Sequence, residues 1–247
     1  MSDPTLAGRT LLVTGGGRRL GAAIARHLGA RGARVVVHYH GSRQASERLV
    51  GELPAGSVAL GADLASPDGP ADLLAACATA GAEPDGVVHG AATFLRRPLA
   101  ATSAADWDAV FALNLRAFFL LARDFARRRG ERGGDLVAIA DAAGLELWPN
   151  YLAHSVSKAA LIALVQGLAK ALAPRYRVNV VIPGPVLPPD GASQAQVEAM
   201  AQRTLLGRLG EPGDVASAVE FMLTCGYATG TTLEVTGGSH LWRRPGG

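Results

Sequence analysis

The sequence has very little cysteine. Only Cys77 and Cys225 occur in 247 residues, which excludes a disulfide framework or a cysteine-rich zinc site, and we expect no metal. Residues 1–10 contain no apolar segment of the kind found in export signals. The longest apolar runs, such as 117–122, are far too short to cross a bilayer. These absences predict a protein of the reducing cytoplasm that has no membrane contact.

Charge is also scarce. Only 18% of the residues are charged and 49% are hydrophobic, which excludes a disordered or fibrous chain because such chains lack apolar surface to bury. The net charge is only +3, and the basic residues are scattered among acidic ones, so we expect no nucleic-acid partner. Lysine is rarest among the basic residues: Lys158 and Lys170 are the only two. A lysine at a functional position is therefore informative.

No stretch rich in proline or glycine marks a linker, so we expect one domain over 1–247. Short apolar runs alternate with segments of helical periodicity. The expected strands are 10–14, 34–38, 58–62, 86–89, 135–140, 177–182 and 232–236. The expected helices are 20–31, 43–52, 71–80, 103–129, 151–172 and 212–223. This order predicts an α/β fold: a Rossmann-like, doubly wound parallel sheet of seven strands with helices on both faces.

Sheets of this type bind ligands at the carboxyl ends of their strands. The loop after the first strand reads Thr-Gly-Gly-Gly-Arg-Arg-Leu-Gly over 14–21. Small residues there let the backbone approach a pyrophosphate, and helix-end N–H groups bind it. Arg18 and Arg19 add positive charge. A dinucleotide is the predicted ligand, and an ordinary tight turn is the alternative.

The loop after the second strand has no acidic residue. Folds specific for NAD place a carboxylate there to hold the ribose hydroxyls, whereas residues 38–43 read His-Tyr-His-Gly-Ser-Arg. We expect Arg19, His40, Ser42 and Arg43 to form a pocket for a 2′-phosphate. The pattern therefore favours NADP(H), and a solvated polar loop is the alternative.

Together these motifs resemble the short-chain dehydrogenase/reductases over nearly the whole chain. The resemblance rests on the glycine loop, Asp63, Asn114, Lys158, Pro183-Gly184, Thr229-Gly230 and Gly237-Gly238. Within the family the chain is most similar to the pteridine reductases, through Arg19-Leu20-Gly21, His38-Tyr39-His40 with Ser42, Phe94 and Asp141. Its ending, 237–241, is similar to the dihydromonapterin reductase branch.

The resemblance implies a homotetramer that binds NADP(H). It implies that Lys158 binds the nicotinamide ribose and lowers the pKa of a neighbouring acid, with support from Asn114 through water. It also implies that Tyr151 lines a pterin pocket. The cofactor contacts it implies are Gly15, Arg18, Arg19, Leu20, Gly21, His38, Tyr39, His40, Ser42, Asp63, Leu64, Ala91, Lys158, Pro183 and Gly184.

The chain departs from the family at its centre. The proton-donating tyrosine, four residues before the lysine, is His154 here. Three further departures are Gly90 for an asparagine, Gly41 for an arginine and Thr236 for an aspartate. A neutral imidazole reaches less far than a phenol, and nearby positive charge disfavours its protonated form. His154 is either a catalytic replacement or a buried residue that packs and forms hydrogen bonds.

Asp141, at the end of the fifth strand, offers another proton donor. A carboxyl group in an apolar cleft has its pKa raised by desolvation and can act as a general acid. Its alternative role is to form an Asx turn at 141–144. Phe94 offers a ring that stacks a flat heterocycle against the nicotinamide, with a loop anchor as its alternative role.

These residues predict an NADPH-dependent oxidoreductase acting on a small molecule, a pterin or another flat heterocycle. The dihydro level is favoured, because in the pteridine reductases the aspartate serves the dihydro form. Two alternatives stay open: a reductase of another small carbonyl substrate, and an NADP(H)-binding pseudoenzyme that has lost its tyrosine.

Overall fold

The computed structural model describes residues 6–241, which form a seven-stranded sheet with all strands parallel. The predicted fold class is confirmed. Residues 1–5, part of the segment expected to carry no export signal, and 242–247, the end of the expected domain, lie outside this range. The strand order is β3-β2-β1-β4-β5-β6-β7. The strands are β1 Thr10–Thr14, β2 Arg34–Tyr39, β3 Val58–Gly61, β4 Gly86–His89, β5 Gly134–Ile139, β6 Tyr176–Pro183 and β7 Thr232–Val235.

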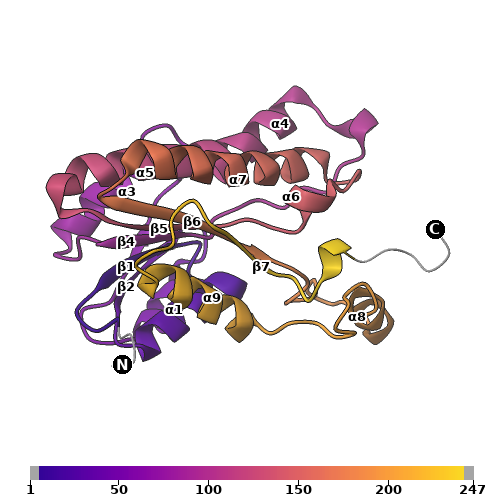
Figure 1. Cartoon of the computed structure of the whole chain (residues 1–247), viewed down its shortest axis with the longest axis horizontal. Helices are drawn as coiled ribbons and strands as arrows, with labels where there is room; N and C mark the ends of the chain where they lie inside the picture. The colour runs from indigo at the N-terminus through magenta and orange to yellow at the C-terminus, as the bar shows by residue number, and fades with distance from the viewer. Residues whose placement is uncertain (1–5, 242–247) are drawn as a thin grey trace.

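Helices cover both faces of the sheet (Figure 1). One face carries α3 (Gly69–Thr79), α5 (Ala117–Arg129) and α7 (Leu152–Leu172), whose apolar residues form one core cluster with the sheet. The other face carries α1 (Arg19–Ala30), α2 (Arg43–Val50) and α9 (Pro212–Thr224), which form the second cluster. Because both faces are buried, the central strands are nearly continuous apolar runs.

The strand order reverses at β1, which pairs with both β2 and β4. β2 and β3 lie on one side of β1, and β4 to β7 on the other. Loops leaving the carboxyl ends of β1 and β4 therefore diverge and leave a crevice between them. The glycine loop and the segment that carries Phe94 border this crevice.

The long helix expected over 103–129 is wrong in its middle. The structure has α4 (Ala104–Phe111), a π-helical turn (Ala112–Arg116) and then α5. Ser103 and Asp106 form a capping box at the start of α4. A π turn inserts a residue into the helix without breaking it, which periodicity does not reveal. Here it buries Asn114 on the side of the crevice.

Two helices occupy segments expected to be loops: α6 (Ala143–Glu146) and α8 (Gln194–Ala201). The start of α8 has a sequence signal, since Ser193 and Gln196 form a capping box. The ends of the other expected helices and strands are shifted by at most two residues, as for α3, which begins at Gly69 rather than at 71. These shifts leave the topology unchanged.

Helix α7 is long and apolar enough to span a membrane. Half of its most apolar window is buried, and it packs against α4, α6 and β6. The buried polar residues His154 and Lys158 lie on it. Its packing is that of a core helix.

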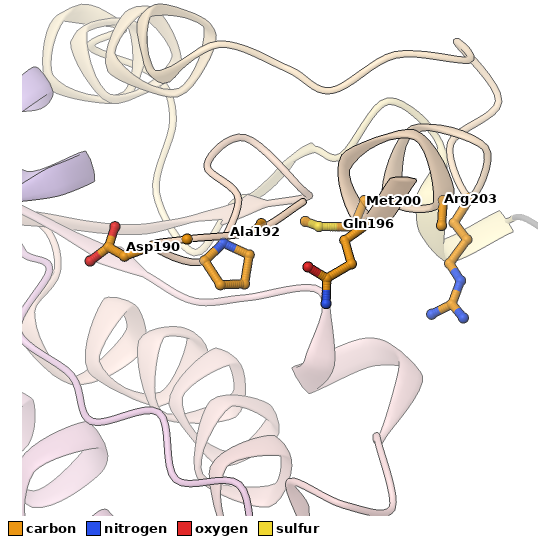
Figure 2. Close-up of a pocket in the computed structure, with 8 residues that line it drawn as sticks. Asp190, Ala192, Gln196, Met200 and Arg203 are labelled. Carbon is orange, nitrogen blue, oxygen red and sulfur yellow. The ribbon is translucent and has the colours of Figure 1, made fainter. Parts of the chain in front are cut away.

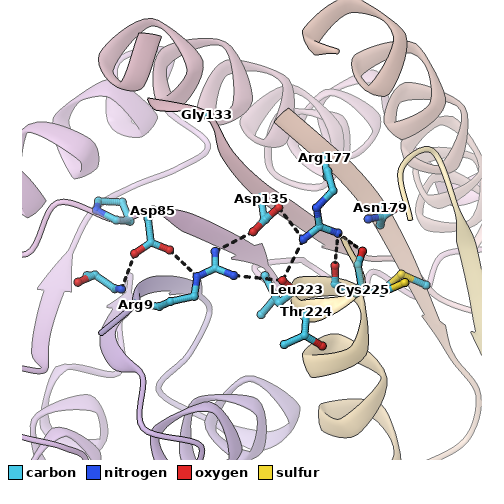
Figure 3. Close-up of polar contacts among 12 residues, drawn as sticks. Arg9, Asp85, Gly133, Asp135, Arg177, Asn179, Leu223, Thr224 and Cys225 are labelled. Atoms are coloured by element: carbon cyan, nitrogen blue, oxygen red, sulfur yellow. Dashed lines mark hydrogen bonds and ion pairs between the residues drawn. The ribbon is translucent and has the colours of Figure 1, made fainter. Parts of the chain in front are cut away.

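An ion-pair network joins the amino-terminal ends of the central strands to α9 (Figure 3). Arg9 pairs with Asp85 at 2.7 Å and with Asp135 at 2.8 Å. Asp135 also pairs with Arg177 at 2.8 Å, and Arg177 donates to the carbonyls of Met222, Leu223, Cys225 and Ala228. The network lies at the edge of the sheet opposite the crevice, so its role is stability.

Replacing Asp135 tests that role. Asp135→Asn removes the negative charge that pairs with the largely buried guanidinium groups of Arg9 and Arg177. We expect it to lower the free energy of unfolding by about 2–3 kcal/mol. Glu52→Gln is the control, because the Glu52–Arg26 pair is half exposed, and it should barely move the midpoint. Urea unfolding of both variants measures the difference. Equal midpoints would show that the network contributes no more than a surface ion pair.

Candidate active site

The glycine loop fits tightly between β4 and α1. Gly15 has a φ of +66°, and a Cβ there would lie 3.0 Å from the Cα of Ala91. A Cβ on Gly21 would overlap the carbonyl oxygen of Gly15. Helix α1 begins at Arg19, and the residue before it provides no side-chain cap. The first N–H groups of α1 are thus not capped by that side chain, as an anion site requires.

Two buried histidines support this loop from below. His38 Nδ1 accepts a hydrogen bond from the Gly15 N–H at 3.1 Å, and its Nε2 lies 3.1 Å from the carbonyl of Ala62. Burial lowers the pKa of His38 to about 4. His89 lies 3.0 Å from the Thr14 hydroxyl, and burial together with the charge of Lys158 lowers its pKa to about 3. Both rings are therefore neutral at pH 7, and His38 supports the loop rather than facing the crevice.

The two arginines of the loop have different partners. Arg18 is exposed, and its side chain has no hydrogen-bond partner within 6–241. Arg19 adopts a φ of +48°, pairs with Asp190 and donates to the carbonyl of Pro188 at 2.7 Å. The expected grouping of Arg19 with His40, Ser42 and Arg43 is therefore not seen. The reason is geometric, because its partners follow β6, on the opposite side of β1 from β2.

The remaining residues of that expected pocket lie together after β2. Ser42 precedes α2 and lies near Gly17, where a Cβ would be 2.8 Å from its hydroxyl. The guanidinium of Arg43 lies 5.8 Å from the centre of the Tyr39 ring. His40 is exposed beside them. Within this loop no carboxylate is present to repel a phosphate.

The other expected cofactor contacts lie at the carboxyl ends of their strands. Asp63 follows β3, where its Oδ1 accepts the Ala65 N–H at 2.9 Å, and Leu64 is buried beside it. Ala91 follows β4, and its N–H donates to the Thr14 hydroxyl. Pro183 ends β6, and Gly184 is packed against Thr236. All of these loops open toward the same edge of the sheet.

Lys158 is buried on α7, where its Nζ donates to the carbonyl of Ile139 at 2.8 Å. Burial lowers its pKa to about 8, and the charge of Asp141 opposes that shift. At neutral pH the side chain is thus a buried cation beside the crevice. Two of its donor hydrogens remain for a ligand.

Asn114 links three segments from the π turn. Its Oδ1 accepts the Thr93 N–H at 2.8 Å, and its Nδ2 donates to the Thr93 carbonyl and to Ser157, each at 3.1 Å. Its side chain therefore holds the loop after β4 against α7, and it does so without touching Lys158 directly.

Asp141 and His154 form a pair. His154 Nε2 lies 3.3 Å from Asp141 Oδ2, and its Nδ1 lies 3.0 Å from the Thr93 carbonyl. The other oxygen of Asp141 accepts the Ala143 N–H at 2.7 Å, so the expected Asx turn exists alongside the contact with His154. The His154 side chain is 2% exposed and that of Asp141 is 27% exposed. The pair is buried at the histidine and open at the carboxylate.

Aromatic side chains cover this pair. The Phe94 ring lies 4.5 Å from the Tyr151 ring and 4.6 Å, edge to face, from His154. Trp148 meets both Phe94 and Tyr151 at its edges, and its indole nitrogen donates to Glu146. Tyr151 precedes the first residue of α7 and reaches the same Phe94 ring that His154 contacts. Phe94 is 54% exposed, so it is available to a flat ligand.

A cavity of about 430 Å³ lies between the loop after β6 and α8. Figure 2 shows Asp190 at one end and Arg203 at the other, with Gln196 and Met200 between them. The Arg19–Asp190 pair ties this segment to the glycine loop across the crevice.

Sequence reasoning missed three residues of the site. Thr93 contributes only its peptide group, so no side-chain pattern reveals it. Asp190 is the acidic partner of Arg19, and it follows a strand end that was expected to carry ligand-binding residues. Trp148 is one of three tryptophans and lies three residues before Tyr151, a signal that was available.

Comparison with known proteins gives the family. The family model described as enoyl-(acyl carrier protein) reductase matches residues 17–240. Versicolorin reductase 1 of Aspergillus parasiticus is 33% identical, over 97% of this chain and 99% of its own. The chain belongs to the short-chain dehydrogenase/reductase family. It is therefore related to oxidoreductases over its full described length.

Solved structures of two further proteins are similar to this chain over nearly its whole length. FolM alternative dihydrofolate reductase 1 from Brucella suis, in complex with NADP, has a TM-score of 0.91 and 30% identity, covering 98% of this chain and 99% of that one. A blue fluorescent protein from a metagenomic library, in complex with NADPH, has a TM-score of 0.86 and 31% identity, over 95% and 99% of the two chains.

The neutral histidines below the glycine loop make stability depend on pH. The folded pKa values of His38 and His89 lie below the ordinary value, so the unfolded chain binds more protons below about pH 6.5. The free energy of unfolding should thus fall as the pH drops from 6.5 toward 4. His38→Gln keeps an acceptor for Gly15 and should remove about 2 kcal/mol of the loss between pH 7 and 4.5.

Urea unfolding at both pH values measures this loss. If His38→Gln loses as much stability as wild type on acidification, the neutral buried ring is not the cause.

Proposed function

We propose that this oxidoreductase reduces a dihydropterin with NADPH, Asp141 supplying the proton. The observation that carries the proposal is the contact of the exposed Phe94 ring with both Tyr151 and His154, the histidine of the Asp141–His154 pair. A simple ketone needs neither a stacking ring nor a carboxylate, whereas a flat, nitrogen-rich heterocycle uses both. The likeness to an alternative dihydrofolate reductase supports the same substrate class.

The expected cofactor, NADP(H), is confirmed by the family and by solved relatives that hold it. The residues of this chain fit the group. Close packing at Gly15 and Gly21 holds the loop backbone beside the start of α1, whose first N–H groups would bind a pyrophosphate. Arg18, which has no side-chain partner within 6–241, would meet the same group. Ser42, His40 and Arg43 would hold the 2′-phosphate.

The bound cofactor supplies a hydride. The residues of this chain do the rest: Lys158 would donate to the nicotinamide ribose and hold it in place. Phe94 and Tyr151 would orient the heterocycle and exclude water from the crevice, and Asn114 would hold the loop that carries Phe94. Asp141, the more exposed member of its pair, would give its proton to a ring nitrogen.

Two other functions have support of their own. A reductase of another small carbonyl substrate agrees with relatives such as the 3-oxoacyl-[acyl-carrier-protein] reductase of a Synechocystis strain, 32% identical over 94% of this chain. An NADP(H)-binding pseudoenzyme agrees with the histidine at 154. Turnover of dihydropterin separates both from the proposal.

We also propose a homotetramer in the cytoplasm. A groove of about 600 Å³ beside α4, α5 and α7 is lined by Phe111, Leu115, Phe119 and Leu164, which suits contact with a second copy. Cys77 and Cys225 are both free thiols, which suits a reducing compartment.

Phe94 provides the test of the proposed substrate. Wild type should turn over dihydropterin with NADPH and scarcely reduce the oxidised ring. Phe94→Ala should lower kcat/KM for dihydropterin about tenfold or more, because a stacked ring contributes on the order of 1 kcal/mol beyond its buried area. NADPH binding should be unchanged.

Phe221→Ala is the matched control, because Phe221 is 52% exposed on α9 and lies on the opposite face of the sheet. Steady-state kinetics and NADPH fluorescence titration give the two readouts. Tight NADPH binding without turnover at either pterin level would favour the pseudoenzyme.

A further inference from the structure

The hydrogen bonds around His154 determine which of its nitrogens carries a proton. Nδ1 lies 3.0 Å from the Thr93 carbonyl oxygen, and a carbonyl oxygen only accepts. Nδ1 must therefore carry a hydrogen and donate it. This tautomer is assigned from the partners of the ring.

Asn114 does not compete for that position. Its Nδ2 lies 3.4 Å from His154 Nδ1, but its two hydrogens serve the Thr93 carbonyl and the Ser157 hydroxyl. The Thr93 N–H fixes the orientation of the amide by donating to Oδ1, and Ser157 passes its own hydrogen to the His154 carbonyl at 2.7 Å. The hydrogens of Asn114 and Ser157 are thus all donated to other acceptors, and none is donated to His154 Nδ1.

The second ring nitrogen then faces a carboxylate. With Nδ1 protonated, a neutral His154 presents a lone pair at Nε2, 3.3 Å from Asp141 Oδ2. Two lone pairs at that distance repel, so the contact is favourable only with a proton between them. Asp141 Oδ1 is occupied by the Ala143 N–H, which leaves Oδ2 as the oxygen that shares the proton.

We propose that His154 and Asp141 hold one proton between them, and that this pair replaces the family's phenol as the proton donor to a C=N bond. The inference rests on the proposed reductase function and explains how it operates without the tyrosine. Asp141 is the catalytic residue, because its carboxylate is the exposed end. His154 is a positioning residue that keeps the proton on the pair.

The reaction balances. The C=N bond of dihydropterin gains a hydride from NADPH at carbon and the shared proton at nitrogen, giving CH–NH, and NADPH is oxidised to NADP⁺. The pair is left as a neutral imidazole facing a carboxylate. Water then restores its proton at the exposed side of Asp141, which relieves the repulsion between the two lone pairs.

The groups around the pair are few. Lys158, on the same helix as His154, is the charged group that interacts with Asp141, and Tyr151 lies at the start of that helix. His89 on β4 interacts with Lys158 and is neutral. The carboxylate thus stands between two potential cations, an arrangement that stabilises it while the pair retains its proton.

Nitrogen-15 NMR of the histidine-labelled wild type tests the proton directly, without substrate. At pH 7, Nδ1 of His154 should be protonated, and Nε2 should carry or share a proton. In Asp141→Asn, the amide has no acidic proton, so Nε2 should shift to the value of an unprotonated nitrogen. An unprotonated Nδ1, or the same Nε2 signal in both proteins, would overturn the proposal.

Kinetics test whether the pair acts as a unit. Asp141→Asn and His154→Gln should each lower kcat for dihydropterin by about 10²-fold, with KM and NADPH affinity within about twofold of wild type. The double variant should be no slower than Asp141→Asn, because both substitutions remove the same shared proton. His154→Gln should also flatten the pH dependence of kcat.

His27→Gln is the control, since His27 also pairs with a carboxylate, Glu220 at 2.6 Å, far from the crevice. It should leave kcat unchanged. Wild-type kcat in His154→Gln, or effects that multiply in the double variant, would refute the shared proton while leaving the reductase intact. Absence of wild-type turnover would refute the reductase, and the NMR result would still decide the pair.

Discussion

The arrangement of this site depends on the hydrogen bonds of the Thr93 backbone. Its N–H and carbonyl hold Asn114 of the π turn, and the carbonyl also holds the ring of His154 on α7. Phe94 follows directly in the chain, so the stacking ring is placed by the same contact. Three segments far apart in sequence meet at the backbone of this one residue.

The cofactor side depends on close packing and on weak surface charge. Tight glycine contacts bring the backbone of the loop near the crevice, and two neutral histidines hold it from below. The Arg19–Asp190 pair is largely exposed, and such pairs contribute little stability. The pair therefore adds little to the stability of the contact between the glycine loop and the segment after β6.

The fold and much of the site were predictable from sequence because both follow short-range patterns. Alternating apolar runs determine the parallel sheet, whose strand ends carry the glycine loop and Asp141, and the helical periodicity of 151–172 places Lys158 on α7. Features that depend on three-dimensional contact were not predictable. The π turn at Asn114 does not alter periodicity, the partner of Arg19 lies 171 residues away, and the role of Thr93 involves no side chain. For His154, the sequence left two roles open, and the structure shows a buried ring that contacts Asp141.

A crystal structure of the protein with NADP⁺ and a dihydropterin tests the proposed substrate and proton donor most directly. We expect the pterin ring to stack between Phe94 and the nicotinamide, with a ring nitrogen within hydrogen-bond distance of Asp141. A pterin bound elsewhere, such as in the cavity beside α8, or a crevice that holds the cofactor while Phe94 and Tyr151 exclude any ring, would contradict it.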